Sequence, residues 1–320
     1  MTGSRFRART RMRAGLAAIG ATCLQASFAV QALSIEFDYR YDTRGFFTDV
    51  ATGAPIAERR AALAAAASYY SGFTDALQPI APGAGNAWSV QFTHPSLDGP
   101  AVTLANEAIA ADTLRIFVGG SSSAPGVLGF ANTGVNLSAS GAAGFVDAVT
   151  TRGQANATGA AASDYATWGG MIWFNATQDW HFGTNGSGPS PGHPDFLTTA
   201  THELGHILGF GEADSWRAQI GADGRFLGAS SVAAYGEPIP LDTFESHWAE
   251  GTLSTRDGIV QETLMDPTTA RGIRELPSTL DYAGLADVGW QVSPVPEPRS
   301  VVLLVVGWLI VRWASRRAAF

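Results

Sequence analysis

Residues 195–211 read DFLTTATHELGHILGFG, and the predicted fold is organised around them. It carries His202, Glu203 and His206 in the pattern H-E-x-x-H, among apolar residues at helical spacing. Residues four apart lie on one face of a helix, so the two imidazoles can point at one metal ion. The Pro-Asp pair at 194–195, where the stretch begins, is typical of a helix start, and the two glycines near its end are typical of a helix exit.

The H-E-x-x-H pattern predicts a zinc site with a catalytic carboxylate. Glu203 follows the first histidine, where its carboxylate could accept a proton from water at the metal. The same pattern also arises by chance on amphipathic helices whose histidines are solvated. A catalytic zinc has three protein ligands and one open position, so a third ligand is expected elsewhere in the chain.

Two residues are candidates for the third zinc ligand. Glu212 lies six residues after His206, and glutamate can bind zinc. His247 lies 41 residues after His206 and is followed by Trp248, and the tetrapeptide LMDP comes later, at 264–267. We favour His247, because histidine is the more usual partner in such sites, and Glu212 stays open as the alternative.

The order HELGHILGF, HW and LMDP resembles the leishmanolysin branch of the metzincin zinc metallopeptidases. The resemblance spans about 70 residues, and the chain departs from the commonest metzincin pattern, HExxHxxGxxH, at Glu212. The resemblance implies a zinc ion held by His202, His206 and His247. It also implies that Met265 forms a turn beneath the metal; plain core packing would bury this methionine as well.

The same resemblance implies an α+β fold with a twisted, mostly parallel sheet, a zinc-binding helix and a smaller, irregular C-terminal subdomain. The strand at 170–175 resembles the metzincin edge strand, which pairs with an extended peptide substrate. The residues expected to contact such a substrate are Gly170, Met171, Ile172 and Trp173.

Hydrophobic patterns predict further elements around this site. Strands are expected at 34–41, 88–93, 112–119 and 169–175, and helices at 56–77 and 280–290. The Gly-, Ala- and Ser-rich segment 120–163 is expected to be a long connection with a short helix near 142–150. Asp223-Gly224 is a hairpin turn signal.

The remaining histidines and the acidic loops give weaker signals. His94, His181 and His193 stand alone in loops, where a histidine is more often structural or solvated than a ligand. The acidic residues Asp214 and Asp223 belong to no EF-hand pattern, so the sequence leaves any calcium requirement open.

Residues 1–32 are typical of a secretory signal peptide: five arginines precede a run of small apolar residues, and cleavage is expected after Ala32. An ordinary buried helix is the alternative. Cys23, the one cysteine of the chain, lies in this segment, so the mature protein has no disulfide and no thiol ligand.

Residues 293–320 resemble the PEP-CTERM sorting signal of Gram-negative bacteria, with VPEP at 295–298, an apolar run at 301–311 and a basic tail. The resemblance implies an exosortase-type processing enzyme and at least transient contact with a membrane. A simple C-terminal anchor is the alternative. With either kind of C-terminal segment, we expect the domain at 33–292 to be exported to the outside of the cell or to its surface.

Residues 33–298 contain 11 arginines and 28 acidic residues, a net charge of −17, which argues against nucleic acid as a partner. The sequence therefore predicts an exported zinc-dependent endopeptidase with a protein or peptide substrate and Glu203 as general base. The alternative is an exported surface or matrix protein whose zinc is structural, with Glu212 and His247 both bound and no open position.

Overall fold

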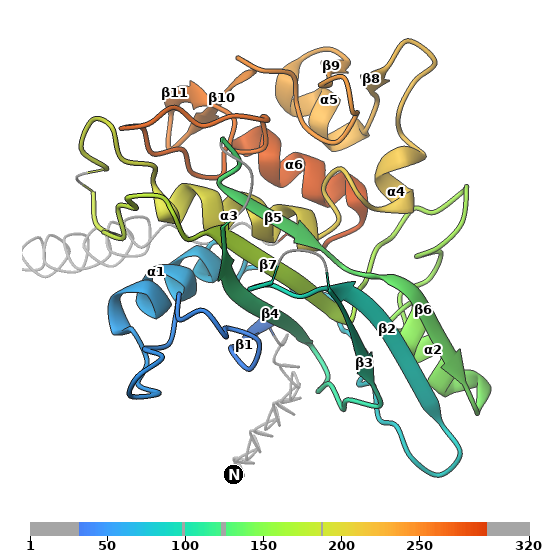
Figure 1. Ribbon diagram of the computed structural model, residues 1–320. Coiled ribbons are helices and arrows are strands. Elements are labelled where there is room, and N and C mark those ends of the chain that lie inside the picture. Colours follow the sequence, from blue (N-terminus) through green and yellow to red (C-terminus); the bar gives the residue numbers. More distant parts are fainter. Residues whose placement is uncertain (1–31, 98–99, 123–125, 187, 293–320) are drawn as a thin grey trace, which may run out of the picture. The chain divides into compact units, whose positions relative to one another are not determined.

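The main sheet of the computed structural model has four strands in the order β1-β4-β7-β5 (Figure 1). The model describes residues 32–97, 100–122, 126–186 and 188–292. β1, β4 and β7 run parallel, and β5 is antiparallel to β7. These strands are β1 (Ser34–Asp38), β4 (Thr113–Ser121), β7 (Gly169–Asn175) and β5 (Gly129–Asn132). The predicted α+β class and the mostly parallel sheet are therefore confirmed.

The side chains of β4 alternate between two buried clusters, as a strand covered on both faces requires. Ile116 and Val118 belong to the larger cluster, which also contains the buried side of the helix that carries the H-E-x-x-H pattern. Phe117 belongs to the other cluster, where it stacks on Phe92 with ring centroids 5.1 Å apart. The main sheet is thus the central layer of the described fold.

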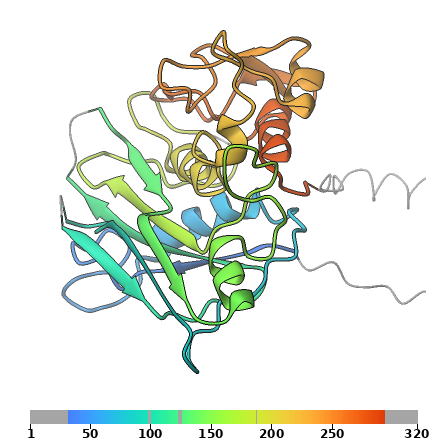
Figure 2. The same ribbon diagram turned by 90° about the vertical axis from the view of Figure 1, so that its right-hand side faces the viewer.

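Helices α1 (Ala57–Ser68) and α3 (Phe196–Ile207) pack against each other, and α3 also packs on β5 and β7. Asp195 caps α3 by accepting a hydrogen bond from the Thr198 amide at 3.2 Å, which confirms the predicted helix start. α3 lies between the main sheet and the C-terminal elements in both views (Figure 1 and Figure 2).

Helix α1 is shorter than the 56–77 that the sequence predicted. The Ser68 and Ser71 hydroxyls bond the carbonyls of Ala65 and Ser68, at 2.6 and 2.8 Å. Such local bonds compete with helical ones, and they mark the place where α1 ends.

A second sheet has the order β3-β2-β6, with strands at Ala101–Ala105, Ala87–Thr93 and Val135–Ser140. β2 was predicted, but β3 and β6 were not. β5 and β6 both lie inside the segment 120–163, which the sequence indicated as a connection. The short helix expected in that segment is present as α2 (Ala143–Thr150).

The C-terminal part is built from short elements. The Asp223-Gly224 turn is present, since the Gly224 amide donates to the Gly221 carbonyl at 2.9 Å. The predicted last helix is α6 (Thr279–Val288), which ends at Gly289 with φ +131°. The other elements are α4 (Asp214–Arg217), β8 (Arg225–Phe226), α5 (Ala229–Tyr235), β9 (Ile239–Pro240), β10 (Leu253–Arg256) and β11 (Ile259–Glu262).

The position of the edge strand differs from the prediction. The strand at 170–175 is β7, and it is hydrogen-bonded to β4 on one side and to β5 on the other. The expectation that Gly170, Met171, Ile172 and Trp173 form a free edge is therefore wrong, because their strand has no open side. The edge beside β7 is β5, which the sequence did not reveal.

The predicted signal peptide, apart from Ala32, and the predicted sorting signal at 293–320 lie outside the described residues. Within the ranges that are described, no helix has both the length and the apolar character needed to cross a membrane.

Candidate metal centre

Three histidines meet at one point beside α3. The Nε2 atom of His206 lies 3.1 Å from that of His202 and 3.0 Å from that of His247. His202 and His206 come from one face of α3, as their spacing predicted. His247 comes from the loop after β9, and together the three form a group that could hold a metal ion.

The other ring nitrogen of each histidine faces an oxygen atom. His202 Nδ1 lies 2.8 Å from the Leu264 carbonyl, and His206 Nδ1 lies 2.9 Å from the Phe210 carbonyl. His247 Nδ1 lies 3.2 Å from Asp242 Oδ2. Each of these oxygens can accept a hydrogen bond from a protonated Nδ1. In the neutral imidazole with its proton on Nδ1, Nε2 carries a lone pair.

The electrostatics of the group suit a cation. Burial, together with the mutual repulsion of the rings if charged, lowers the pKa of His206 to about 4 and that of His202 well below its usual value. Burial also lowers the pKa of His247. Three neutral imidazoles therefore point lone pairs at one another, which is unfavourable unless a cation lies between them. Tetrahedral zinc at its usual bond length separates two Nε2 atoms by roughly 3.3 Å, close to the spacing here.

Asp242 and Gly211 position His247. Asp242 accepts hydrogen bonds from the backbone amides of Ser246 and His247, at 2.9 and 3.2 Å, and its second oxygen faces the imidazole. Gly211, with φ +75°, lies so close to the Ser246 carbonyl that any side chain there would collide with it. The end of α3 and the His247 loop are therefore in direct contact.

Met265 packs against α3, the helix that carries His202 and His206. A Cβ atom added at Gly205 would lie 2.6 Å from Met265 Sδ, so the thioether fills the space that a larger residue would need. Met265 is buried, and its carbonyl accepts the Trp248 amide at 2.9 Å. The segment that was predicted to lie under the metal is thus bonded to the residue next to His247.

Asp281 holds the Leu264–Met265 segment in place. Its carboxylate accepts the amides of Leu264 and Met265, at 3.0 and 3.1 Å, and the Trp248 indole at 3.2 Å. The residue is also part of a capping box at the start of α6, with Ser278 as N-cap. Burial raises the pKa of Asp281 above its usual value, although the hydrogen bonds from Ser278, Leu264 and Met265 offset part of this rise.

Glu203 is buried on α3 between the two histidines of the helix, and burial raises the pKa of its carboxyl to about 8. The edge strand passes directly over it. A Cβ atom at Gly129 would lie 2.8 Å from Glu203 Oε1 and 3.1 Å from Thr199 Cγ2. Gly129 therefore allows the edge strand to approach this carboxyl closely.

Glu212, the alternative third ligand, is not part of the group. Its carboxylate lies 3.5 Å from the Arg217 guanidinium, and about half of its side chain is exposed. Among the described His, Cys, Asp and Glu residues, only the three histidines meet at this point. Of the two candidates for the third ligand, His247 therefore lies with His202 and His206, and Glu212 does not.

The other histidines also lie outside the group. His94 Nδ1 accepts the Ser96 amide at 3.1 Å, and His193 Nδ1 lies 3.3 Å from Asp179. The backbone amide of His181 donates to the Pro194 carbonyl at 3.0 Å, just before α3. Their positions agree with the expectation that lone histidines in loops are more often structural or solvated than metal ligands.

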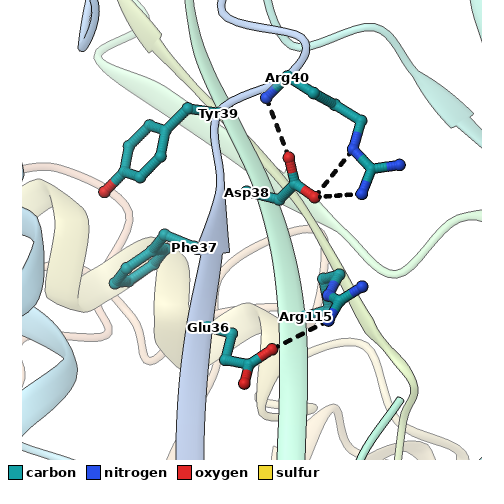
Figure 3. A pocket seen from close by; sticks show the side chains of 6 residues that line it. All are labelled: Glu36, Phe37, Asp38, Tyr39, Arg40 and Arg115. Carbon is teal, nitrogen blue, oxygen red and sulfur yellow. Dashed lines mark hydrogen bonds and ion pairs between the residues drawn. The ribbon is translucent and has the colours of Figure 1, made fainter. Parts of the chain in front are cut away.

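A surface hollow along β1 and β4 does not involve the histidines (Figure 3). Its charged residues are paired with one another: Arg115 with Glu36 at 3.0 Å, and Arg40 with Asp38 at 2.7 Å. These internal ion pairs leave little free charge in the hollow to bind a ligand.

Sequence reasoning missed two carboxylates of the metal centre, Asp242 and Asp281. The S-x-x-D pattern at 278–281 signals the capping role of Asp281, but nothing in it points to the turn at Met265. Asp242 lies five residues before His247, a spacing that has meaning only once the loop geometry is known.

Comparisons with protein-family models, with curated proteins and with solved structures found no match to this chain.

Proposed function

We propose that this chain is a zinc-dependent endopeptidase of the metzincin type. The observation that carries the proposal is the convergence of three Nε2 atoms next to a buried carboxylic acid, Glu203. His202, His206 and His247 are the zinc ligands. Zinc has three protein ligands and one free position in catalytic sites, and the group supplies this number.

The roles of the site residues follow from their chemistry. Zinc bound by three imidazoles would act as a Lewis acid that polarises the peptide carbonyl and lowers the pKa of water. Glu203 accepts the proton that the attacking water loses and passes it to the leaving amine nitrogen. A carboxyl whose pKa burial has raised can both take up and release a proton near neutral pH.

A peptide substrate fits the edge strand β5. Its outer side pairs with no other described strand, so an extended peptide can add to the main sheet there by backbone hydrogen bonds. Gly129 holds this edge against Glu203, which would bring a bound peptide close to the general base. In this arrangement the peptide pairs with β5, and β7 lies on the other side of β5 and does not contact the peptide.

The structural-zinc alternative is less well supported. A structural site has four protein ligands, and the fourth was expected to be Glu212. Its carboxylate is directed to Arg217, and no further described ligand joins the three histidines. The position of Glu203 beside the group would also have no purpose in a purely structural site.

The cellular context is proposed from the sequence. Export depends on the signal-like segment 1–32, and processing by an exosortase-type enzyme depends on the VPEP segment and basic tail at 293–320. The domain would then act outside the cell or at its surface, after transient contact with a membrane.

Cleavage of casein by the purified full-length chain tests the proposal, beside Glu203→Gln and with zinc measured in both proteins. Glu212→Gln is the matched control, because it removes a carboxylate nine residues after Glu203 that does not join the group. We expect Glu203→Gln to retain zinc and to lose activity by about 10²-fold or more, while Glu212→Gln stays active. Equal cleavage by all three proteins would contradict the role of Glu203.

A further inference from the structure

A second group of acidic residues lies outside the three-histidine centre. Carboxylate oxygens of Glu250, Glu262 and Asp266 all approach one another within 4.8 Å. Glu250 follows the His247 loop, Glu262 ends β11, and Asp266 directly follows Met265. The group is therefore assembled from three segments that are separate in sequence.

The carboxylate of Asp266 is buried and has no hydrogen-bond partner. The residue is 1% exposed, and neither Oδ1 nor Oδ2 meets a donor among the described residues. Its neighbours are other acids: the carboxylates of Glu275, Glu262 and Glu250 all act on it. An unpaired buried carboxylate is costly unless it is protonated or meets a cation.

Glu275 adds a fourth carboxylate at the buried side of the group. It is 4% exposed, and its Oε2 is unpartnered as well. Its backbone amide donates to Thr198 Oγ1 at 2.9 Å, so this residue also attaches the acidic group to α3. None of the ion pairs among the described residues involves any of the four acids.

Other buried acids of this chain show the contrast. Asp195 is buried and forms an ion pair with Arg274 at 2.8 Å. Asp281 is buried and accepts several backbone amides. Protein donors thus compensate the carboxylates of Asp195 and Asp281, whereas neither carboxylate oxygen of Asp266 meets a donor among the described residues.

We propose that Glu250, Glu262 and Asp266 form a second metal site, which binds Ca²⁺. The donors are all carboxylate oxygens, which hard cations prefer, whereas zinc prefers the imidazoles of the other centre. Ca²⁺ accepts irregular sets of six to eight oxygens, and Thr268, whose hydroxyl donates to Glu250 at 2.6 Å, lies beside the group. Mg²⁺ demands a nearly octahedral set of oxygen ligands, a stricter geometry than Ca²⁺ requires.

A cation here would join the segments that frame the zinc centre. Asp266 continues from Met265, which packs under α3, and Glu250 lies three residues after His247. Ca²⁺ would bridge these two segments to β11 and hold them in register. The inference does not depend on peptidase activity, because it concerns only binding and stability.

The test is thermal unfolding of the full-length chain, stripped of metal and reloaded with one equivalent of zinc, then titrated with Ca²⁺ at constant ionic strength. Calorimetric titration of the same samples gives the number of sites. We expect one saturable Ca²⁺ site, and at about a hundredfold excess over Kd a Tm increase of about 5 °C. Mg²⁺ at the same concentration should produce a clearly smaller shift.

Asp266→Asn and Glu262→Gln should abolish the Ca²⁺-dependent shift or weaken binding at least tenfold. Without Ca²⁺, Asp266→Asn should be at least as stable as the wild type, because it removes repulsion among the acids. Asp257→Asn is the matched control, an exposed carboxylate in the turn between β10 and β11, and it should respond like the wild type. Absence of a Ca²⁺ effect in the wild type, an unchanged effect in both variants, or an equal effect of Mg²⁺ would overturn the proposal. Glu262 is only partly buried, so its substitution is less disruptive to the core. If Asp266→Asn does not fold, Ca²⁺ binding is therefore tested with Glu262→Gln.

Discussion

Gly205 and Met265 are packed so closely that a side chain at position 205 would have to displace the methionine thioether. An added Cβ atom would lie 2.6 Å from Sδ and 3.0 Å from Cε of the methionine. Gly205→Ala should therefore destabilise the protein by about 1–2 kcal/mol, because overpacking outweighs the better helix propensity of alanine. Urea unfolding, followed by circular dichroism, measures this difference.

The control for that substitution is Gly144→Ala in α2. Nothing lies within 4 Å of a Cβ atom at this position, and its backbone is helical. Alanine should be neutral there or stabilise by up to about 1 kcal/mol. Equal effects of the two substitutions would contradict the close packing of Met265 against α3.

Asp242→Asn should weaken zinc binding without unfolding the chain. The carboxylate faces His247 Nδ1 at 3.2 Å, and a neutral amide makes the imidazole a poorer ligand. A loss of about 10- to 100-fold in zinc affinity is expected for a partner of this kind. Competition with a chromogenic chelator measures the affinity, and Asp223→Asn, in the exposed turn before β8, serves as control. An unchanged affinity in Asp242→Asn would mean that this carboxylate does not orient the ligand.

Gly129→Ala should reduce peptide cleavage while zinc stays bound. The new methyl group would enter the space of Glu203 Oε1, 2.8 Å away, and displace either the carboxyl or the edge strand. A decrease in kcat/KM of about tenfold or more is expected from a displacement near 1 Å. Gly186→Ala, which has open space around its Cβ, should keep its activity. Full activity in Gly129→Ala would argue against β5 as the substrate strand.

The metal-free protein should lose stability as the pH rises. Burial and neighbouring acids raise the folded-state pKa of Asp266 from 3.8 to about 9 and that of Glu275 from 4.5 to about 7. The folded state thus binds protons more tightly than the unfolded state at these groups. Their contribution is fully present below the unfolded pKa values and is lost as the pH passes the folded ones.

Asp266→Asn isolates this pH effect. In chelator, the wild type should show a falling free energy of unfolding from about pH 5 towards pH 9, and the variant should show a shallower fall. The three histidines contribute to both proteins alike, so the difference between the two profiles reports on the acidic group. Parallel profiles would show that Asp266 does not titrate in this range.

The sequence predicted the parts of the site that depend on local spacing. The face shared by His202 and His206, the cap at Asp195 and the strand at 169–175 all follow from helical or strand periodicity, and all are present. The position of His247 was favoured through its motif and not through geometry. The choice against Glu212 needed the three-dimensional path of the His247 loop, which brings Ser246 against Gly211.

Other features could not be predicted because they arise from tertiary contacts. β5 is only four residues long, GFAN, and shows no clear alternation, so nothing local marks it as the edge strand. The prediction assigned the edge to β7, whose apolar run is equally typical of a strand buried on both faces. The Asp266 group comes from segments spread over 250–275, and no local pattern signals that their carboxylates meet.

Anomalous diffraction at the zinc edge, in crystals of the zinc-loaded protein, would locate the metal directly. We expect one zinc ion bonded to the Nε2 atoms of His202, His206 and His247, with Glu203 nearby and Glu212 turned away. No protein side chain should take the fourth position on the metal. A zinc ion with four protein ligands, or no zinc at the three histidines of a folded chain, would contradict the catalytic centre proposed for this protein.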